Sequence, residues 1–274
     1  MATGIIEVIG PPGIGKTTLY NALCKKWRPS YNWTYEDALL AAAPPFSDFK
    51  NWIVYKTKKV LKKRLSPRGV STEHGLPFSK FHPELTNFCW QQLASENIYN
   101  KEESGLRFRL AYFLFADFCR YQAIMEKKSS RPCLLNGGLL QKSFLIESDL
   151  QQMSHLINNY LPLVPLPNAI IYINTEDKEL IVERLINRNK IIPTQLGKNK
   201  KELIEDIVQW QYQFEIIISW MLKHNVIVYN IDGARSVKEN VLTITKILEK
   251  QKYFQLSPNQ KENTNVIAEQ QALM

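Results

Sequence analysis

The octapeptide Gly10-Pro11-Pro12-Gly13-Ile14-Gly15-Lys16-Thr17 decides the fold of this chain. It fits the pattern of a glycine, four variable residues and then Gly-Lys-Thr without a mismatch. Residues 4–9, directly before it, form a short apolar run rich in β-branched residues, which is typical of a buried strand. Residues 17–26, directly after it, have apolar positions at helical spacing. We therefore predict a strand, a glycine-rich loop and a helix in succession, which is the setting this motif requires.

The glycines of this loop favour the binding of phosphate groups. Without a Cβ they adopt backbone conformations closed to other residues, so that successive N–H groups turn inward around an anion. The following helix adds its positive N-terminal end, Lys16 would reach the β- and γ-phosphates, and the Thr17 hydroxyl would hold Mg²⁺. A glycine-rich turn without a ligand is the alternative. The residues predicted to bind a nucleoside triphosphate are Gly10, Pro11, Pro12, Gly13, Ile14, Gly15, Lys16, Thr17 and Thr18.

The composition is that of an ordinary globular protein. Of the 274 residues, 45% are apolar and 22% are charged, and no apolar run approaches the ~20 residues of a membrane-spanning helix. The first expected strand begins almost at the N-terminus, which leaves no room for a signal peptide. The four cysteines lack the paired spacing of a zinc site or a disulfide framework. We therefore expect reduced cysteines and a cytoplasmic protein.

The positive charge is concentrated in one segment. The chain has 35 basic and 26 acidic residues, a net charge of +9, and eight of the basic residues lie between Lys50 and Arg68 with no acidic residue among them. Interleaved apolar residues would give a helix here one apolar and one basic side. Three interpretations stay open: a solvated helix packed on the core, an electrostatic funnel for an anionic substrate, and a peripheral contact of residues 50–68 with a membrane or another polyanion. No nucleic-acid-binding module is recognisable, so nucleic acid is not an expected partner.

Strands and helices alternate along the rest of the chain. Apolar runs predict further strands at 31–35, 132–135, 169–173 and 226–229. Helical spacing predicts helices at 106–128, 143–160, 176–188, 201–223 and 236–251. This order predicts an α/β fold, a parallel five-stranded sheet with helices on both faces. Residues 1–251 would form a single domain, and residues 252–274 a polar, frayed tail.

The loops that follow the strands should meet at one edge of this sheet. Right-handed crossovers place every such loop at the carboxyl ends of the strands. The glycine loop, the pair Glu36-Asp37, Asn136 and Asn174 should therefore converge there. We predict the site at this edge.

Four blocks of sequence follow one another at the predicted strand ends. They are the glycine loop at 10–17, Leu134-Leu135-Asn136-Gly137-Gly138-Leu139-Leu140-Gln141, the segment from Ile171-Tyr172-Ile173-Asn174 to Glu183-Arg184-Leu185-Ile186-Asn187-Arg188, and Val228-Tyr229-Asn230-Ile231-Asp232-Gly233. In this order they resemble the P-loop kinases of the nucleoside monophosphate kinase type, especially thymidylate-kinase-like and other small-molecule kinases. Only the first block is highly specific, and the others gain weight from their order and spacing. The resemblance covers residues 1–40 and 130–250 and leaves 44–130 as a helical insertion.

The resemblance implies ATP- and Mg²⁺-dependent phosphoryl transfer to a small molecule. Arg184 and Arg188, four residues apart on one helix face, would belong to a lid at 184–201 that closes over the transferred phosphoryl group. Guanidinium groups suit this role because they stay charged and bind phosphate oxygens bidentately. The alternative for both arginines is a surface ion pair with a nearby glutamate. The turn at Asp232 and Gly233 would border the adenine.

The second block departs from the family pattern. The relatives commonly have Asp-Glu where this chain has Asn136-Gly137. The family's carboxylate supports the Mg²⁺ shell or deprotonates the acceptor, and neither asparagine nor glycine is a general base. Glu36 and Asp37 are the candidate replacements, with Asp37 as a catalytic residue and Glu36 as a substrate ligand. Alternatively, this acidic pair complements the dipole of a helix N-terminus.

The insertion at 44–130 should hold the acceptor. Arg107, Arg109 and Arg120 flank the helix that leads to the third strand, a region that lines the acceptor pocket in the relatives. Arg107, Arg109 and Asn136 are the candidate substrate ligands. The alternative for each is an ordinary surface or core position. The leading hypothesis is a kinase for a sugar, a nucleoside or a nucleotide. Two others remain: a catalytically weak nucleotide-binding protein that senses or sequesters a ligand, and a basic NTPase associated with a membrane or a polyanion.

Overall fold

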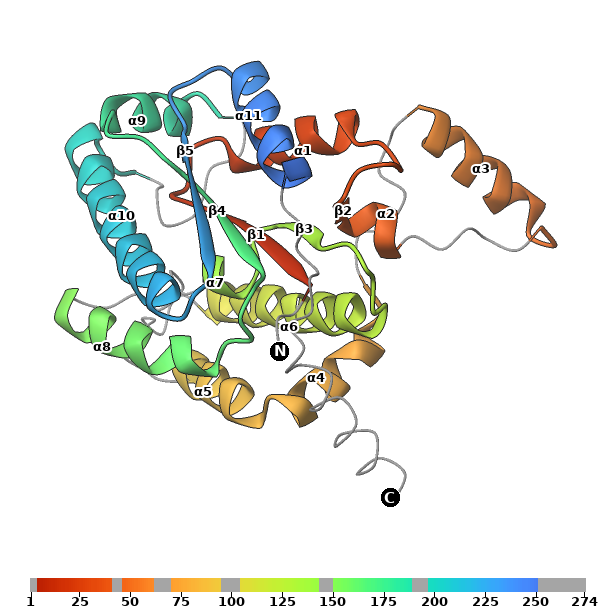
Figure 1. Ribbon diagram of the computed structural model, residues 1–274. Coiled ribbons are helices and arrows are strands. Elements are labelled where there is room, and N and C mark those ends of the chain that lie inside the picture. The colour runs from red at the N-terminus through yellow and green to blue at the C-terminus, as the bar shows by residue number, and fades with distance from the viewer. Residues whose placement is uncertain are drawn as a thin grey trace.

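The computed structural model describes residues 4–40, 46–61, 70–94, 104–142, 150–188 and 197–250 (Figure 1). Within them, the strands β1 (Ile5–Ile9), β2 (Thr34–Tyr35), β3 (Cys133–Asn136), β4 (Ala169–Asn174) and β5 (Ile227–Asp232) form one sheet. Their order is β2-β3-β1-β4-β5, and every neighbouring pair is parallel. The predicted α/β fold with a parallel five-stranded sheet is confirmed.

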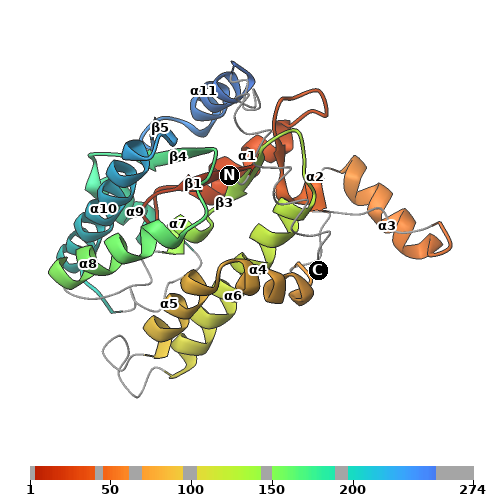
Figure 2. The ribbon, with the colours of Figure 1, turned by 60° about the horizontal axis from the view of Figure 1, so that its bottom comes forward.

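Helices cover both faces of this sheet (Figures 1 and 2). One face carries α1 (Lys16–Lys26), α9 (Lys178–Ile186) and α11 (Val237–Lys250). The other carries α4 (Gly75–Phe81), α5 (Pro83–Ala94), α6 (Ser104–Glu126), α7 (Leu139–Lys142), α8 (Leu150–Tyr160) and most of α10 (Lys200–Lys223). The remaining helical elements are α2 (Glu36–Leu40), α3 (Phe49–Val60) and the short 3₁₀ turns η1 (Thr72–His74) and η4 (Leu161–Leu163).

Alternate side chains of β1 enter two separate cores. Ile6 and Val8 pack with residues of α1, α9 and α11, whereas Ile5 and Ile9 pack with residues of α4 to α8 and α10. Successive strand residues point to opposite faces of a sheet, so Glu7 points to the same side as Ile5 and Ile9. A fully buried carboxyl group therefore lies inside an otherwise apolar core.

The elements differ from the sequence prediction mainly at their ends. The second strand is limited to two residues, and α2 begins directly after it at Glu36. The helix expected at 176–188 spans Lys178–Ile186. Of the helix expected at 143–160, the structure has Leu150–Tyr160, and residues 143–149 lie outside the described part of the chain. The expected tail at 252–274 lies outside it as well.

The segment between β2 and β3 contains α2 to α6, and the expected helical insertion at 44–130 covers α3 to α6 of it. Its longest helix, α6, packs against the sheet, whereas α3 projects away from the body of the molecule (Figures 1 and 2). No residue of α3 is buried. The interpretation of this segment as a helix packed on the core is therefore wrong for the described residues 49–60. None of the helices in the described ranges is long and apolar enough to cross a bilayer.

Candidate nucleotide and acceptor site

The glycine loop connects β1 to α1 with a backbone that only glycine accommodates at two positions. Gly13 has a φ of +86°, and a Cβ there would lie 2.6 Å from Cγ of Leu185. Gly15, the residue before α1, has a φ of +102°. Left-handed conformations of this kind turn backbone N–H groups toward a common centre. Gly13 and Gly15 therefore have the left-handed backbone conformation that the predicted anion nest requires.

Lys16, the first residue of α1, folds back over this loop. Its Nζ donates hydrogen bonds to the carbonyl oxygens of Gly10 (2.6 Å) and Pro11 (2.8 Å). Burial, together with the positive charges of Arg188 and Lys142, lowers the pKa of Lys16 from 10.5 to about 7. Three cationic side chains thus lie near one another at the loop, an arrangement that a polyphosphate anion would stabilise.

Gln141 of α7 holds the beginning of the loop in place. Its Oε1 accepts a hydrogen bond from the Gly10 N–H (3.1 Å), and its Nε2 donates to the Gly10 carbonyl oxygen (3.2 Å). Gln141 is buried. One side chain therefore pairs with both polar groups of a buried backbone position, and the Gly10 N–H in particular relies on it because the carbonyl oxygen also accepts from Lys16.

Replacing Gln141 with methionine is expected to destabilise the fold by about 2 kcal/mol, because it keeps the volume and leaves the Gly10 amide unpaired. Urea denaturation measures this loss of stability. The loop is then less well positioned, so we also expect weaker ATP binding by calorimetry. The exposed Gln91 of α5 gives the matched control, Gln91→Met, which should change neither quantity. Equal stability of the two variants would contradict the positioning role.

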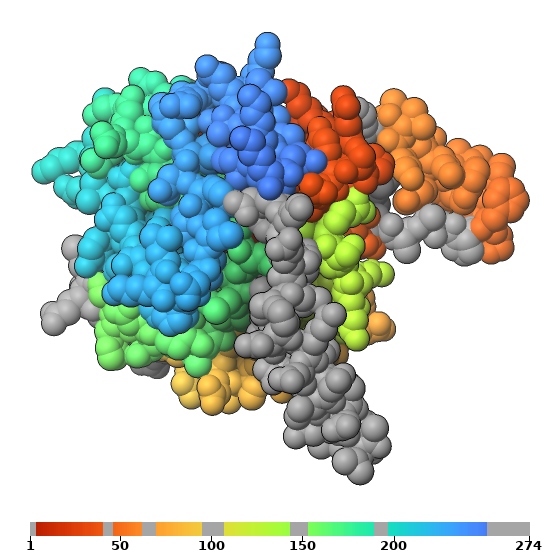
Figure 3. All heavy atoms as spheres, in the orientation of Figure 1, coloured from red at the N-terminus to blue at the C-terminus, as the bar shows by residue number. Residues whose placement is uncertain are grey.

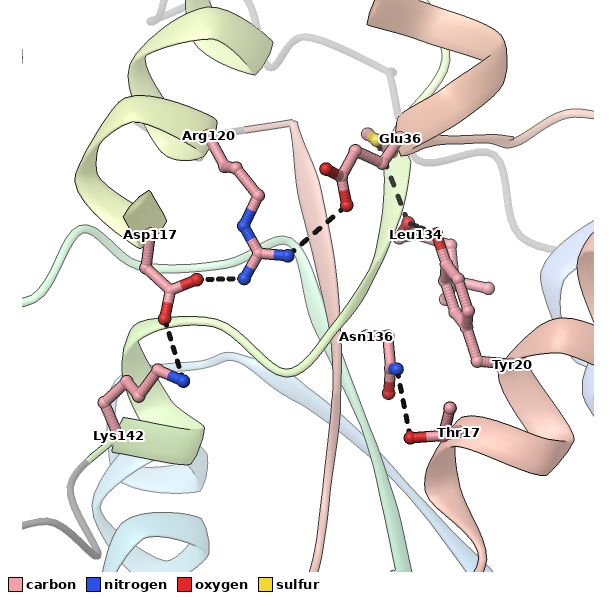
Figure 4. Close-up of polar contacts among 9 residues, drawn as sticks. Thr17, Tyr20, Glu36, Asp117, Arg120, Leu134, Asn136 and Lys142 are labelled. Carbon is pink, nitrogen blue, oxygen red and sulfur yellow. Dashed lines mark hydrogen bonds and ion pairs between the residues drawn. The ribbon is translucent and has the colours of Figure 1, made fainter. Parts of the chain in front are cut away.

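Thr17 and Asn136 lie together where a Mg²⁺ ion would be expected. The Asn136 side-chain amide at the end of β3 is 3.4 Å from Thr17 Oγ1 (Figure 4). Mg²⁺ is commonly held by one or two protein oxygens together with substrate phosphates and water. The Thr17 hydroxyl fits this requirement, and Asn136 supplies a neutral amide oxygen rather than a carboxylate. Nowhere in the described residues do three or more His, Cys, Asp or Glu side chains gather as a metal site.

A chain of ion pairs connects α6 to the start of α2 and to α7 (Figure 4). Arg120 of α6 pairs with Asp117 on the same helix and with Glu36 at 3.4 Å. Lys142 lies 3.2 Å from the other oxygen of Asp117, whose side chain is only 1% exposed. Burial disfavours the charge of Arg120, but Asp117 and Glu36 raise its pKa above the ordinary value. These groups share a stable, charged network beside the glycine loop.

Glu36, rather than Asp37, is the acidic residue in this network. Asp37 follows it on α2 and helps to raise the pKa values of Tyr35 and Cys24, both of which are raised mainly by burial. The sequence analysis gave the catalytic role to Asp37 and substrate binding to Glu36, and these roles stay predictions; the structure shows that Glu36 pairs with Arg120. The structure also agrees with the alternative that this pair lies at a helix N-terminus, because α2 begins at Glu36.

The Glu7 carboxyl group forms a second polar cluster, close enough to the ion-pair network of Asp117 and Arg120 for their charges to affect its pKa. Its Oε1 accepts hydrogen bonds from the Tyr121 hydroxyl and from the Leu140 N–H (3.4 Å). A Cβ on Gly138 would lie 2.8 Å from the carboxyl carbon of Glu7, so the glycine at this position makes room for the buried acid. Burial raises the pKa of Glu7 from 4.5 to about 7, against the lowering effect of these hydrogen bonds.

Arg184 connects the glycine loop to the turn after β5. Its guanidinium donates to the carbonyl oxygens of Ile14 (3.1 Å) and Gly233 (2.9 Å). It therefore contacts the main chain rather than forming the surface ion pair considered as an alternative. Gly233 also lies against Ile14, where a Cβ would come within 2.6 Å of the isoleucine side chain. The turn expected to border adenine thus adjoins the loop expected to hold phosphates.

Two other predicted residues lie at the same turn and at the end of α9. Asp232 accepts a hydrogen bond from the Ala234 N–H (2.8 Å), which stabilises the turn. Arg188 follows α9, lies close enough to Lys16 to lower its pKa, and has its own pKa lowered by burial. Residues 189–196, the middle of the expected lid, lie outside the described residues. The closure of a lid by both arginines stays a prediction.

The two arginines predicted to bind the acceptor lie near the start of α6. Arg109 is 5.6 Å from the ring of Phe113, and Lys142 is 5.6 Å from the same ring. Arg109, Phe113 and Asp117 recur every four residues, so they share one face of α6. This face leads from Arg109 to the ion-pair network. Arg107 lies two residues before Arg109 and therefore points to another side of the helix.

Sequence reasoning missed several residues that the structure brings to this place. Gln141 and Lys142 belong to a four-residue helix, which is too short to show a periodic pattern, and Asp117 lies inside a long, mainly apolar helical stretch. The sequence did contain one usable signal, which is an acidic residue at a position that should face the core, as for Glu7 and Asp117. Such a residue must be paired or neutral when it is buried, so it indicates a polar site inside the fold.

Comparisons with known proteins give little further guidance. The sequence matches no protein-family model and no curated protein. Among solved structures, a shikimate kinase from Bacteroides thetaiotaomicron is similar to this chain with a TM-score of 0.38 and 13% sequence identity, over 89% of this chain and 97% of the other. This likeness is distant. The fold assignment rests on the strand order and the glycine loop of the chain itself.

Proposed function

We propose that the chain is a kinase that transfers the γ-phosphoryl group of ATP to a hydroxyl group of a small molecule. One observation carries the proposal: the loop with Lys16 and Thr17 lies beside a buried network that contains the carboxylate of Glu36. A phosphate-binding loop and a carboxylate next to it are the two parts that phosphoryl transfer to a hydroxyl group requires.

In this reaction, each residue of the site would have a separate role. The acceptor oxygen attacks the γ-phosphorus and its proton passes to the Glu36 carboxylate, while the bond from phosphorus to the β–γ bridging oxygen breaks and ADP leaves with the electron pair. Lys16 and Arg188 would stabilise the negative charge on the phosphates. Mg²⁺, bound through Thr17, would neutralise further phosphate charge.

The ion-pair network favours a hydroxyl acceptor over an anionic phosphate acceptor. Arg120 and Lys142 already pair with Asp117 and Glu36, so their charges are balanced within the protein. An anionic phosphate at this point would face two carboxylates, and like charges at short distance repel. The acceptor would be a sugar or a nucleoside, with Arg109 and Phe113 at the open end of the same helix face.

An acceptor screen tests this proposal. The purified chain is incubated with ATP and Mg²⁺ and a panel of sugars, nucleosides and their monophosphates, and products are read by mass spectrometry. A product heavier by one phosphoryl group, formed from an unphosphorylated acceptor and absent with Lys16→Met, supports it. A product formed only from monophosphates would overturn the assignment of a hydroxyl acceptor. Consumption of ATP without any phosphorylated product would overturn the kinase itself.

Asn136 supports a second candidate, a nucleotide-binding protein with little turnover. It lies 3.4 Å from Thr17 and offers no negative charge for a Mg²⁺ ion. A Mg²⁺ ion that is bound weakly at this site would slow phosphoryl transfer but would still allow ATP to bind. Such a protein would sense or sequester its ligand.

The variant Asn136→Asp distinguishes the two candidates. Because a carboxylate attracts Mg²⁺ more strongly than an amide does, we expect the Mg²⁺ concentration for half-maximal activity to fall about tenfold. Titrating Mg²⁺ at fixed ATP measures this change, and Asn136→Ala serves as the uncharged control. Tight ATP binding with no turnover in the original chain, unrestored in Asn136→Asp, would favour the sensor instead.

A further inference from the structure

The helix α3 exposes an apolar stripe to solvent. Phe49 is 54% exposed, Ile53 43% and Val60 80%, and no residue of the helix is buried. Phe49, Trp52 and Ile53 are three or four residues apart and Val60 follows two turns after Ile53, so these residues share one side of the helix, with Lys56 and Thr57 at the positions between Ile53 and Val60. Phe46, Phe49 and Trp52 form an aromatic cluster with ring centroids 5.3 to 6.2 Å apart.

Lysines lie both within this stripe and around it. The helix carries Lys50, Lys56, Lys58 and Lys59, and Lys56 Nζ lies 5.1 Å from the Trp52 ring. The acidic residue at its N-cap is Asp48, whose side chain accepts a hydrogen bond from the Asn51 N–H. The sequence continues with four more basic residues up to Arg68 and no acidic one. The segment from Lys50 to Arg68, which begins in α3, therefore carries eight positive charges, while the net charge of the whole chain is +9.

The position of α3 in the molecule makes this surface accessible. The helix stands away from the sheet and its covering helices in both ribbon views (Figures 1 and 2), and the space-filling view shows it as a separate projection (Figure 3). Its side chains contribute nothing to either core of the described residues. A large exposed apolar surface of this kind is normally covered by a partner.

We propose that α3 docks the protein on a membrane surface that contains anionic lipids. An amphipathic helix with aromatic and aliphatic residues on one side and lysines around it lies in the plane of such an interface, with its apolar side in the acyl boundary and its ammonium groups at the headgroups. Charge complementarity favours an anionic surface, since the segment from Lys50 to Arg68 has no negative charge. The exposed apolar stripe favours a bilayer over a nucleic acid, which would leave Phe49, Ile53 and Val60 in water. The proposal does not depend on the catalytic activity.

Vesicle sedimentation of the full chain tests the proposal. The chain should sediment with phosphatidylcholine vesicles that contain phosphatidylserine, and not with phosphatidylcholine alone. Replacing Lys56, Lys58 and Lys59 with glutamine should lower the partition coefficient roughly 100-fold, because each basic residue near an anionic surface contributes about fivefold. The matched control removes three exposed lysines of α11, as Lys238→Gln, Lys246→Gln and Lys250→Gln, and should bind vesicles like the original chain.

The apolar stripe is tested separately. The double variant Ile53→Ser and Val60→Ser should also lose binding, and brominated lipids should quench a fluorescence component that is missing in Trp52→Phe. An unchanged thermal melt would show that these exposed substitutions leave the fold intact. Failure of the original chain to sediment with the anionic vesicles would overturn the proposal. Binding that depends on the lysines but not on Ile53 and Val60, with equal binding to heparin, would also overturn it and indicate a soluble polyanion.

Discussion

Replacing Lys16 with methionine is expected to weaken ATP binding about 100-fold and to lower phosphoryl transfer about 1000-fold. In the free protein, the ammonium group of Lys16 is held by the carbonyl oxygens of Gly10 and Pro11, next to two other cations. Those neighbours and burial lower its pKa to about 7, so its charge is poorly stabilised until an anion arrives. A bound triphosphate supplies that anion. Methionine fills the same space and provides no charge.

Calorimetric titration with ATP measures the loss of binding, and product formation in the acceptor assay measures the loss of turnover. Lys25→Met, an exposed substitution on the same helix, is the matched control and should leave both unchanged. A thermal melt separates loss of function from loss of structure. Because Lys16→Met removes a charge that is unfavourable to bury, it should not melt at a lower temperature. Normal ATP binding by this variant would show that the loop does not serve a triphosphate.

The sequence predicts the centre of this fold well because its signals are local. The apolar residues of β1, the glycines of the loop and the helical spacing of α1 lie within about twenty consecutive residues, and the structure has all three elements in place. The parallel sheet follows from the alternation of strands and helices. For the same reason the convergence of Glu36, Asn136 and the glycine loop at one sheet edge could be expected, and Figure 4 shows Glu36, Asn136 and Thr17 in the same region.

The parts that sequence reasoning could not predict depend on contacts between distant residues. Glu36 and Asp37 are adjacent, and the pairing of Glu36 with Arg120, 84 positions away, depends on the fold. Gln141 contacts Gly10 across 131 positions. The apolar side of α3 looks like that of a helix packed on a core, and the sequence does not reveal that nothing in the described residues covers it. A helical pattern predicts an amphipathic helix, not its partner.

The buried carboxyl group of Glu7 should make stability depend on pH. Burial raises its folded-state pKa to about 7, whereas in the unfolded chain it titrates near 4.5. The folded protein therefore binds this proton more tightly than the unfolded chain does. The stabilising contribution is fully present below about pH 4.5 and is lost as the pH rises through about 7. From about pH 5.5 to about pH 8, Glu7 should remove about 2 kcal/mol from the free energy of unfolding.

The variant Glu7→Gln isolates this contribution. Lys16 acts in the opposite direction, since its lowered pKa makes stability increase with pH from about 7 upward, and it affects both proteins equally. We therefore expect the difference in unfolding free energy, original chain minus Glu7→Gln, to fall by about 2 kcal/mol over this pH range in urea denaturation. The exposed Glu84 of α5 provides the control Glu84→Gln.

The slope with pH, rather than the absolute stability of the variant, is the diagnostic measurement. Glutamine can keep the oxygen that accepts from Tyr121 and Leu140, but its amino group replaces Oε2, which has no hydrogen-bond partner among the described residues. An unsatisfied amide lowers stability at every pH and leaves the slope unaffected. Parallel curves for the original chain and Glu7→Gln would show that Glu7 titrates normally. A difference that falls with pH would show that a protonated carboxyl group, accommodated by Gly138, belongs to the core beside the glycine loop.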